Sequence, residues 1–450
     1  MERFTPPTAA ASAAWQESGV PAARIAGISC TGHGKGLYLW GRDDRPVCPG
    51  IVSTDTRAWE YPRRWREDGT ADRAFRKTYQ QVLASQQVSL LAWMKDHRPE
   101  LLDNIRWIFS VKDYIRFRLT GEAYAELTDF SGANLVNLDA CGYDRELLAL
   151  FGLEELFDRL PPLRRSCDRC GRVTAETVRL TGLKEGTPVA GGMFDIDACA
   201  VAMDVTDEKN LCVIAGTWGI NEYVAREPVK NGSVLMNSIF CLPGYYLVEE
   251  SSPTSAGNHE WFTRMFLQEL REEAAAAGLS VYQYADRLAA EAPDGGERIV
   301  FLPYLFGSNF DPRARAALVG MDSSHKGRSS RGARGNRLRH MDHRPAAGQP
   351  PPSDAIRRGR GQRNPLGAFV RDVTGLPVEV IDTAELGALG CAMAAAVMAG
   401  DYPDLRAAAG GMVRVRERVE PDLEKTAAYR EKRRAYRKVA QALEPVWGCL

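Results

Sequence analysis

Ten residues near the middle of the chain, 189–198, constrain the fold more than any other stretch. A short apolar run ends in Gly191 and Gly192, Asp195 follows closely, and a run of small residues comes next. This pattern predicts a buried strand, a tight turn and the start of a closely packed helix. A carboxylate at such a turn lies at a sheet edge, where α/β proteins form ligand sites. The same carboxylate could instead cap the helix.

A second stretch, 212–219, reads as another buried strand that ends in a Gly-Thr-x-Gly turn. The free backbone N–H groups of Gly216, Thr217 and Gly219 are suited to hold a phosphate. Such a sequence is often only a turn. An acid and a phosphate cradle on neighbouring elements together indicate phosphoryl transfer.

Length and charge limit the class of protein. The chain has 450 residues, enough for two or three domains, and 58 basic residues balance 58 acidic ones. A net charge of zero argues against a general polyanion binder or a membrane-surface protein, and no apolar run approaches 18 residues. Several of the ten cysteines sit among apolar neighbours, which favours a cytoplasmic protein with reduced thiols.

Metal binding has little support in the sequence. Cys167 and Cys170 form the one close cysteine pair, and the second pair that a zinc ribbon needs is absent. We therefore predict no metal-ligating residues.

The rest of the chain alternates strand and helix patterns. An apolar strand over 25–30 precedes a flexible Gly-rich turn that contains Gly32, His33 and Gly34, and 37–40 looks like the return strand. Asp55 and Arg57 follow an apolar run, where α/β ligand sites lie, although a solvated salt bridge is the simpler interpretation. The pattern also predicts strands at 105–110, 211–215, 234–240, 245–248, 299–302 and 378–381, helices at 8–19, 88–94, 112–119, 258–276 and 421–443, and a polar turn at 127–132.

One segment, 326–371, lacks periodicity. Eleven arginines crowd it and a Pro-Pro-Pro run interrupts it, which is typical of a disordered basic linker. Nucleic-acid binding is an alternative, but the segment has no interleaved aromatic residues. A structureless stretch of this length is unusual inside a compact enzyme.

Taken in order, these motifs resemble the FGGY carbohydrate kinases that act on ketopentoses and polyols. The stretch 189–198 resembles the family's catalytic segment, 216–219 its second phosphate loop, and 31–34 the sugar-contacting turn of xylulokinases. Residues 301–316 and 385–390 resemble two further family segments, and the Phe-Asp-Ile-Asp and Gly-Thr-Trp details resemble the L-xylulose kinase branch.

The resemblance implies an α/β fold of two ribonuclease-H-like domains of the actin/hexokinase type around a central cleft. Residues 1–204 would bind sugar and residues 205–450 would bind ATP, with Mg²⁺ bridging its phosphates. The implied partners are a small-molecule sugar and a nucleotide, without nucleic acid or membrane, and a homodimer is compatible with this interpretation.

The resemblance also implies roles for single residues. Asp195 would be the catalytic base, with Asp197 capping the helix or supporting it. The residues implied for substrate binding are Gly32, His33, Gly34, Asp55 and Arg57. Those implied for ATP binding are Gly216, Thr217 and Gly219. Lys112 and Asp113 are interpreted as structural.

Two departures from the family pattern lead to further expectations. The β-hairpin that carries the family's first phosphate loop does not precede residue 25, and 326–371 replaces a helix and the adenine loop. We expect a compensated frameshift, which resequencing of the gene would test. For the start we expect a misplaced initiation site or a degraded gene, and a search for in-frame upstream codons of the missing hairpin would test the former. The alternative function is a catalytically impaired kinase remnant that binds only sugar or a partner.

Overall fold

The computed structural model describes residues 15, 17–215, 219–252, 260–261, 263–265, 270–284, 287, 299–305, 313–320, 355–359 and 371–449. Within these ranges, no helix is both long enough and apolar enough to cross a membrane. Most of the predicted helix over 8–19 and most of 326–371 lie outside the described residues. The described residues of the predicted helix over 258–276 are helical, and 270–276 form α11.

The chain divides into two compact units. Unit 1 comprises Met1–Asp207, Val224–Val248 and Glu385–Val413, and unit 2 comprises Glu208–Tyr223, Glu249–Ala384 and Arg414–Leu450. Both units are therefore assembled from segments that are distant in the sequence. The division after residue 204 that the sequence suggests stays a prediction about domains.

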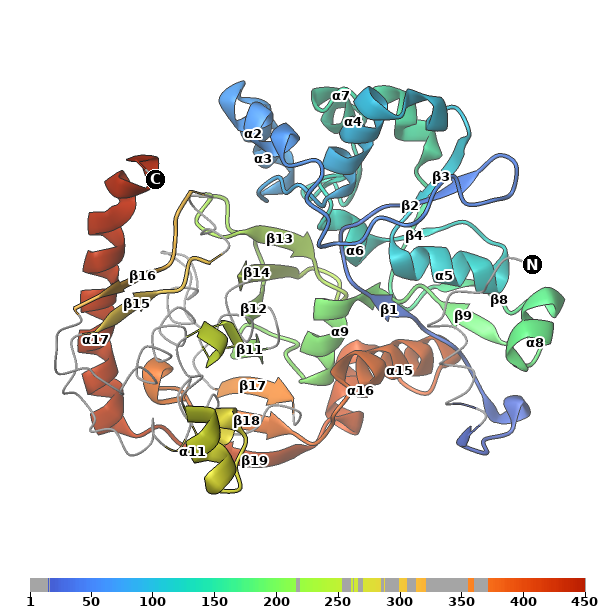
Figure 1. Ribbon diagram of the computed structural model, residues 1–450. Helices are drawn as coiled ribbons and strands as arrows, with labels where there is room; N and C mark the ends of the chain where they lie inside the picture. Colours follow the sequence, from blue (N-terminus) through green and yellow to red (C-terminus); the bar gives the residue numbers. More distant parts are fainter. Residues whose placement is uncertain are drawn as a thin grey trace. The chain divides into compact units, whose positions relative to one another are not determined.

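Unit 1 combines short strands with many helices (Figure 1). Its strands are β1 (Thr31–Gly32), β2 (Tyr38–Gly41), β3 (Ile105–Phe109), β4 (Ala125–Glu126), β5 (Val136–Asn137), β6 (Gly142–Tyr143), β7 (Leu163–Arg164), β8 (Arg169–Arg172), β9 (Pro188–Ala190), β10 (Met193–Phe194) and β13 (Met236–Ile239). Its α-helices are α2 (Glu60–Glu67), α3 (Thr70–Thr78), α4 (Gln87–His97), α5 (Val111–Thr120), α6 (Leu127–Ser131), α7 (Arg145–Leu150), α8 (Ala175–Thr181), α9 (Asp195–Ala202), α15 (Leu386–Ala399) and α16 (Leu405–Met412). Three 3₁₀ turns complete it: η1 (Ala22–Arg24), η2 (Pro99–Leu101) and η3 (Glu154–Arg159).

The predicted strand over 25–30 is wrong in detail. In this stretch Ile28 forms only an isolated bridge with Val189, and the paired strand is β1, which runs parallel to β10. The return strand β2 pairs antiparallel with β3 instead. The glycines of the turn let the chain leave the β1–β10 pair immediately after Gly32, so the two predicted strands never meet as a hairpin.

Helix α6 contradicts the predicted polar turn at 127–132. All five of its residues are buried, and the Glu126 carboxylate caps it by accepting the N–H groups of Thr128 and Asp129. The polar side chains looked like a surface turn because their partners are distant in the sequence. A capped helix of buried polar residues cannot be distinguished from a turn by local pattern alone.

Helices α9 and α15 lie side by side in unit 1 (Figure 1). Small residues dominate both, and a Cβ atom at Gly390 would collide with the backbone of Ala198. Glycine is therefore required at residue 390 for the two backbones to approach this closely.

Unit 2 is built on a sheet in which β12 (Gly219–Ala225), β11 (Asn210–Ala215), β17 (Ala355–Gly359), β18 (Val378–Ile381) and β19 (Val415–Val419) are neighbours in that order. Strands β11, β17 and β18 are mutually parallel, and β12 and β19 run antiparallel to their neighbours. Further elements of the chain are β14 (Tyr246–Ser252), α11 (Leu270–Ala276), β15 (Val300–Leu302), β16 (Ala317–Val319), α17 (Leu423–Leu443) and η6 (Glu444–Cys449).

Strand β17 corrects the expectation that 326–371 is structureless. Ala355 and Ile356 are each 1% exposed, and Ile356 donates its N–H to the carbonyl of Pro377. Arg357, the next residue, pairs with Glu379 on β18. The arginines concealed this strand because a charged side chain with a partner on the adjacent strand fits a sheet as well as an apolar one. The remainder of 326–371 lies outside the described residues.

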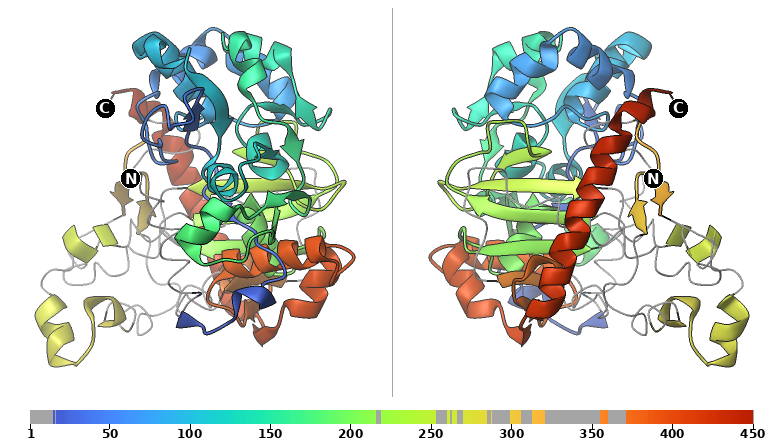
Figure 2. Two further views of the ribbon diagram at one scale, coloured as in Figure 1. Left: turned by 90° about the vertical axis from the view of Figure 1, so that its right-hand side faces the viewer. Right: turned by 90° about the vertical axis from the view of Figure 1, so that its left-hand side faces the viewer.

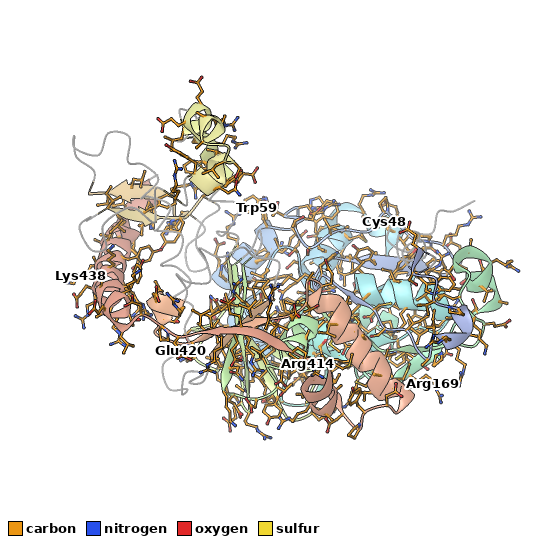
Figure 3. The ribbon with its side chains drawn as sticks, turned by 90° about the horizontal axis from the view of Figure 1, so that it is seen from below. Cys48, Trp59, Arg169, Arg414, Glu420 and Lys438 are labelled. Atoms are coloured by element: carbon orange, nitrogen blue, oxygen red, sulfur yellow. The ribbon has the colours of Figure 1, made fainter. Side chains whose placement is uncertain are left out.

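Helix α17 and strand β19 are two further elements of unit 2. Helix α17 is a single long helix (Figure 2), and its Tyr436 packs into a cluster with Val300 and Leu302 of β15. Strand β19 runs between Arg414 and Glu420, which are labelled in Figure 3, and four of its five residues are exposed. Charged side chains on an exposed edge strand discourage pairing with other chains.

Candidate active site

The predicted strand, turn and helix around Asp195 are confirmed. Strand β9 ends at Ala190, Gly191 and Gly192 form the turn, and β10 leads directly into α9. Gly192 has φ +81°, and a Cβ atom there would collide with the carbonyl of Cys30. Residue 192 must therefore be a glycine for the turn before α9 to pass this close to Cys30.

Asp195 is the first residue of α9 and is half-buried, whereas its neighbours on both sides are buried. Residues 191–194 and 196–198 anchor it on either side. A carboxylate in the first turn of a helix is stabilised by the helix dipole. Asp195 is thus the one residue of 191–198 that is not buried.

The turn predicted to contact sugar lies beside Asp195. Thr31 and Gly32 pair in parallel register with Met193 and Phe194, and Thr31 Oγ1 donates to the Met193 carbonyl at 3.0 Å. Because parallel strands end at the same sheet edge, the next residues, His33 and Asp195, leave the sheet together. The structure therefore brings these two predicted site residues to one place.

Two glycines make this approach possible. A Cβ atom at Gly34 would collide with the ring of Phe194, and one at Gly32 would lie 2.6 Å from Val111 Cγ1. The turn is pressed against β10 on one side and against the start of α5 on the other.

Both nitrogens of His33 have partners within unit 1. Nδ1 lies 3.2 Å from the carbonyl of Gly34, and Nε2 lies 3.1 Å from the hydroxyl of Tyr38. A carbonyl can only accept, so Nδ1 carries the proton and Nε2 accepts from Tyr38. Burial raises the pKa of Tyr38 above its ordinary value, which keeps this hydroxyl protonated. The imidazole is held in one orientation and one tautomer.

Beneath the turn lies a fully buried cluster of charged side chains, which we call the buried cluster. Lys112 Nζ lies 3.1 Å from Asp113, 3.4 Å from Glu126 and 3.3 Å from Asp129. Arg116 Nη1 lies 2.7 Å from Asp113. All five side chains are 0% exposed. The expectation that Lys112 and Asp113 are structural agrees with this burial.

Burial and charge act in opposite directions within the buried cluster. Burial would lower the pKa of Lys112, but the neighbouring carboxylates raise it above its ordinary value. Burial raises the pKa of Asp129 to about 6 even though Lys112 opposes the shift. The pKa of Asp113 is lowered, because Lys112 and Arg116 outweigh the effect of its burial.

Asp197 does not cap its helix, which corrects one of its two predicted roles. Its Oδ1 accepts the N–H of Cys241 at 3.0 Å, and its buried Oδ2 has no hydrogen-bond partner among the residues that the structure describes. Burial, followed by the charge of Glu126, raises the pKa of Asp197 well above the ordinary range. Asp197 therefore ties α9 to the segment after β13.

Asp55 and Arg57 bind one another. Two guanidinium nitrogens of Arg57 contact the two carboxylate oxygens of Asp55 at 2.9 and 2.8 Å, and the guanidinium lies over the ring of Trp93. Side-chain exposure is 42% for Arg57 and 19% for Asp55. The structure has the salt bridge of the simpler interpretation, and a sugar contact stays a prediction.

The predicted phosphate turn is mostly outside the described residues. Gly216 and Thr217 belong to the gap at 216–218, and Gly219 is the first residue of β12. Their role in ATP binding stays a prediction. Among the residues that the structure does describe, no group of three or more His, Cys, Asp or Glu side chains is placed to hold a metal ion.

The sequence reasoning missed three residues. Tyr38 contacts His33, Thr128 contacts Phe194 directly before Asp195, and Glu126 contacts Thr128. Tyr38 looked like an ordinary strand residue, and the other two fell in or beside the supposed polar turn. The available signal was the Glu-x-Thr-Asp pattern at 126–129, in which an acid precedes two backbone N–H groups that it can cap.

Comparisons with known proteins agree with this geometry. Residues 2–202 match the N-terminal domain of the FGGY family of carbohydrate kinases. The chain is 31% identical over 434 residues to the L-xylulose/3-keto-L-gulonate kinase of Escherichia coli K12, covering 95% of this chain and 85% of that protein. It is 30% identical over 437 residues to a probable L-xylulose kinase of Pasteurella multocida, covering 95% and 86%.

Solved structures confirm the predicted fold class, two ribonuclease-H-like α/β domains of the actin/hexokinase type. The ligand-bound xylulose kinase from Lactobacillus acidophilus matches with a TM-score of 0.85 at 22% identity, covering 94% of this chain and 86% of that one. The glycerol kinase of Plasmodium falciparum with ADP matches with a TM-score of 0.76 at 18% identity, covering 92% and 83%.

Proposed function

The chain belongs to the FGGY family of carbohydrate kinases, and we propose that it transfers the γ-phosphoryl group of ATP to a hydroxyl of a ketopentose such as xylulose. Phosphoryl transfer to a sugar is the activity of the family. The ketopentose is proposed because two relatives at 30% identity or more are named as L-xylulose kinases. The observation that carries the site is the parallel register of β1 and β10, from which His33 and Asp195 leave together.

Asp195 acts as the general base in this proposal. Its carboxylate accepts the proton of the attacking hydroxyl, whose oxygen then forms a bond to the γ-phosphorus while the bond to the β,γ-bridging oxygen breaks and ADP leaves. The half-buried position suits this role, because Asp195 keeps part of its surface exposed while buried residues on both sides fix its backbone.

The turn of Gly32, His33 and Gly34 orients the sugar. The Tyr38 hydroxyl donates its hydrogen bond to His33 Nε2, so its oxygen can still accept a hydrogen bond from a sugar hydroxyl. We place Asp55 and Arg57 at the same substrate, where their pair would have to share its hydrogen bonds with the sugar. Gly216, Thr217 and Gly219 are proposed to hold the ATP phosphates through backbone N–H groups.

Mg²⁺ is proposed to accompany the nucleotide. This ion keeps several waters and needs only one or two carboxylates besides the phosphates, so the absence of a three-ligand group among the described residues is compatible with it. When bound, the ion neutralises phosphate charge.

ATP consumption with a panel of sugars tests this function. Wild-type protein is expected to consume ATP with a ketopentose such as L-xylulose, and Asp195→Asn is expected to lower kcat about 10²–10⁴-fold. Calorimetric titration should show that the Asn variant still binds sugar.

Two outcomes would contradict the proposal. An Asn variant with near-parental turnover would exclude Asp195 as the base. Sugar binding without ATP consumption by the wild-type protein, for every member of the panel, would instead favour the impaired remnant.

A further inference from the structure

The turn that carries Asp195 is held at both ends by buried polar side chains. Arg116 Nη1 donates to the carbonyl of Gly191, where the turn begins. At its other end, the N–H of Phe194 donates to Thr128 Oγ1 at 2.9 Å. Phe194 is the residue directly before Asp195, so this second contact acts one peptide unit from the carboxylate.

The hydroxyl of Thr128 has its direction set by Glu126. It has one proton, which it donates to Glu126 Oε2 at 2.7 Å, so towards Phe194 it can only accept. Glu126 is fixed in turn by the N–H of Thr128 at 3.1 Å, by Ser166 Oγ at 2.9 Å and by the charge of Lys112. The carboxylate polarises the hydroxyl and strengthens its acceptance of the Phe194 N–H.

Burial makes this contact obligatory. Glu126 and Thr128 are 0% and 2% exposed, and Phe194 is 4% exposed. A buried N–H that loses its acceptor must find another or move towards water. Phe194 also immediately precedes α9 and its side chain makes no capping bond to the helix, so any movement of its peptide group rotates the start of α9 and redirects Asp195.

We propose that Thr128, oriented by Glu126, is a positioning residue for Asp195: by accepting the Phe194 N–H it holds the carboxylate in line with the sugar hydroxyl. This inference rests on the proposed function, in which Asp195 is the base. It assigns Thr128 no contact with sugar or nucleotide, so its loss should reduce the chemical step and leave binding largely intact.

The experiment compares two variants of Thr128 with one matched control. Thr128→Val keeps the volume and removes the acceptor, whereas Thr128→Ser keeps the hydroxyl. Thr181→Val is the control: Thr181 is also buried, donates to the carbonyl of Thr177 at 2.8 Å and accepts the N–H of Leu183 at 3.3 Å, but lies at the end of α8. For each variant, kcat, the KM values for L-xylulose and ATP, sugar affinity by calorimetry and Tm are measured.

The expected result is a split between kcat and KM. Thr128→Val should lower kcat about 10- to 100-fold, since a small misplacement of a reacting group costs this much, with both KM values within about twofold of wild type. Thr128→Ser should stay within about threefold of the wild-type kcat. Thr181→Val should have a lower Tm than wild type and an unchanged kcat. If the Val variant does not fold, Thr128→Cys, with a weakly accepting Sγ, should have a kcat below that of Thr128→Ser.

The failures are distinguishable. Wild-type kcat in Thr128→Val or Thr128→Cys, alongside an inactive Asp195→Asn variant, would overturn the positioning role and leave the proposed function intact. An equal loss of kcat in Thr181→Val would show that the effect follows from stability alone and would also overturn it. Turnover retained in Asp195→Asn would instead remove the proposed function.

Discussion

Among the described residues, Asp113 of unit 1 and Glu379 of unit 2 are each shared by two cations, in very different surroundings. In unit 1, Asp113 contacts Lys112 at 3.1 Å and Arg116 at 2.7 Å, and no part of these side chains is exposed. In unit 2, Glu379 contacts Arg357 at 2.9 Å and Arg418 at 2.8 Å. The exposure of these three side chains is 11%, 15% and 46%, respectively.

The two arrangements also arise differently. Asp113 and Arg116 lie three residues apart on α5, a spacing at which helix geometry brings side chains together, and Lys112 directly precedes Asp113 on the same helix. Glu379 stands opposite Arg357 and Arg418 because three strands are paired in register. The sheet ladder of Arg357, Glu379 and Arg418 therefore depends on the fold being complete, whereas part of the buried cluster is present in any conformation that contains α5.

The comparison shows where a charged pair contributes most to the stability of this protein. Removing one partner from a buried group leaves an uncompensated charge, which is costly, whereas water can replace a partner in a half-exposed pair. The buried cluster also supports the turn of Asp195 through Arg116 and Glu126. The sheet ladder instead joins three adjacent strands on one face of a sheet.

The largest expected effect of this contrast is on stability. Lys112→Met leaves Asp113, Glu126 and Asp129 buried without their shared cation, and should lower the free energy of unfolding by about 3–5 kcal/mol. Urea unfolding measures this change. Lys95→Met is the matched control, because Lys95 pairs with Glu155 at the surface, with side-chain exposures of 41% and 49%. Equal losses in the two variants would remove the distinction between buried and exposed pairs.

A smaller effect is expected from pH. The pKa of Asp129 is about 6 in the folded protein and about 3.9 in an unfolded chain, so the folded state holds the proton more tightly. Its contribution to stability is complete below about pH 4 and is lost as pH rises through 6, by at most on the order of 3 kcal/mol.

Asp129→Asn tests this sign. The variant should lose less stability than wild type between pH 5 and pH 7, as measured by urea unfolding at each pH. Lys112, Asp113, Glu126 and Asp197 are the charged or titratable groups around Asp129, and they remain unchanged in the variant. Parallel stability profiles for the two proteins would show that Asp129 is not the group that titrates.

The smallest effect is expected in the sheet ladder. Arg418→Met removes a half-exposed partner of Glu379, which keeps Arg357, and should cost no more than about 1 kcal/mol. Arg357→Met should cost more than Arg418→Met, because the side chain of Arg357 is 15% exposed against 46%. Urea unfolding of both variants decides the order. A reversed order would mean that exposure does not control the value of these pairs.

The sequence predicted the centre of the site because its signal is local. An apolar run, two glycines and an acid are sufficient to predict the strand, turn and helix around Asp195. The register of β1 with β10 could not be derived in the same way, because it joins residues 162 positions apart, such as Thr31 and Met193. The family resemblance supplied the association of His33 with Asp195 that periodicity could not.

Charged and polar residues account for the errors. Arg357 and Arg358 made β17 look like part of a linker, and Thr128 and Asp129 made α6 look like a turn. Arg357 pairs with Glu379 and Asp129 with Lys112, and a local pattern shows neither contact. The Glu-x-Thr-Asp pattern indicates a cap but not the contact of Thr128 with Phe194, which only the tertiary structure provides.

The discontinuity of unit 1 has a consequence for its biosynthesis. Helix α9, which begins with Asp195, packs against α15, and α15 starts almost two hundred residues later. On the ribosome, α9 therefore has no α15 to pack against until most of the polypeptide has emerged. The small-residue face of α9 stays uncovered through that interval, so nascent chains are most exposed to misassociation and to chaperones at this stage of translation.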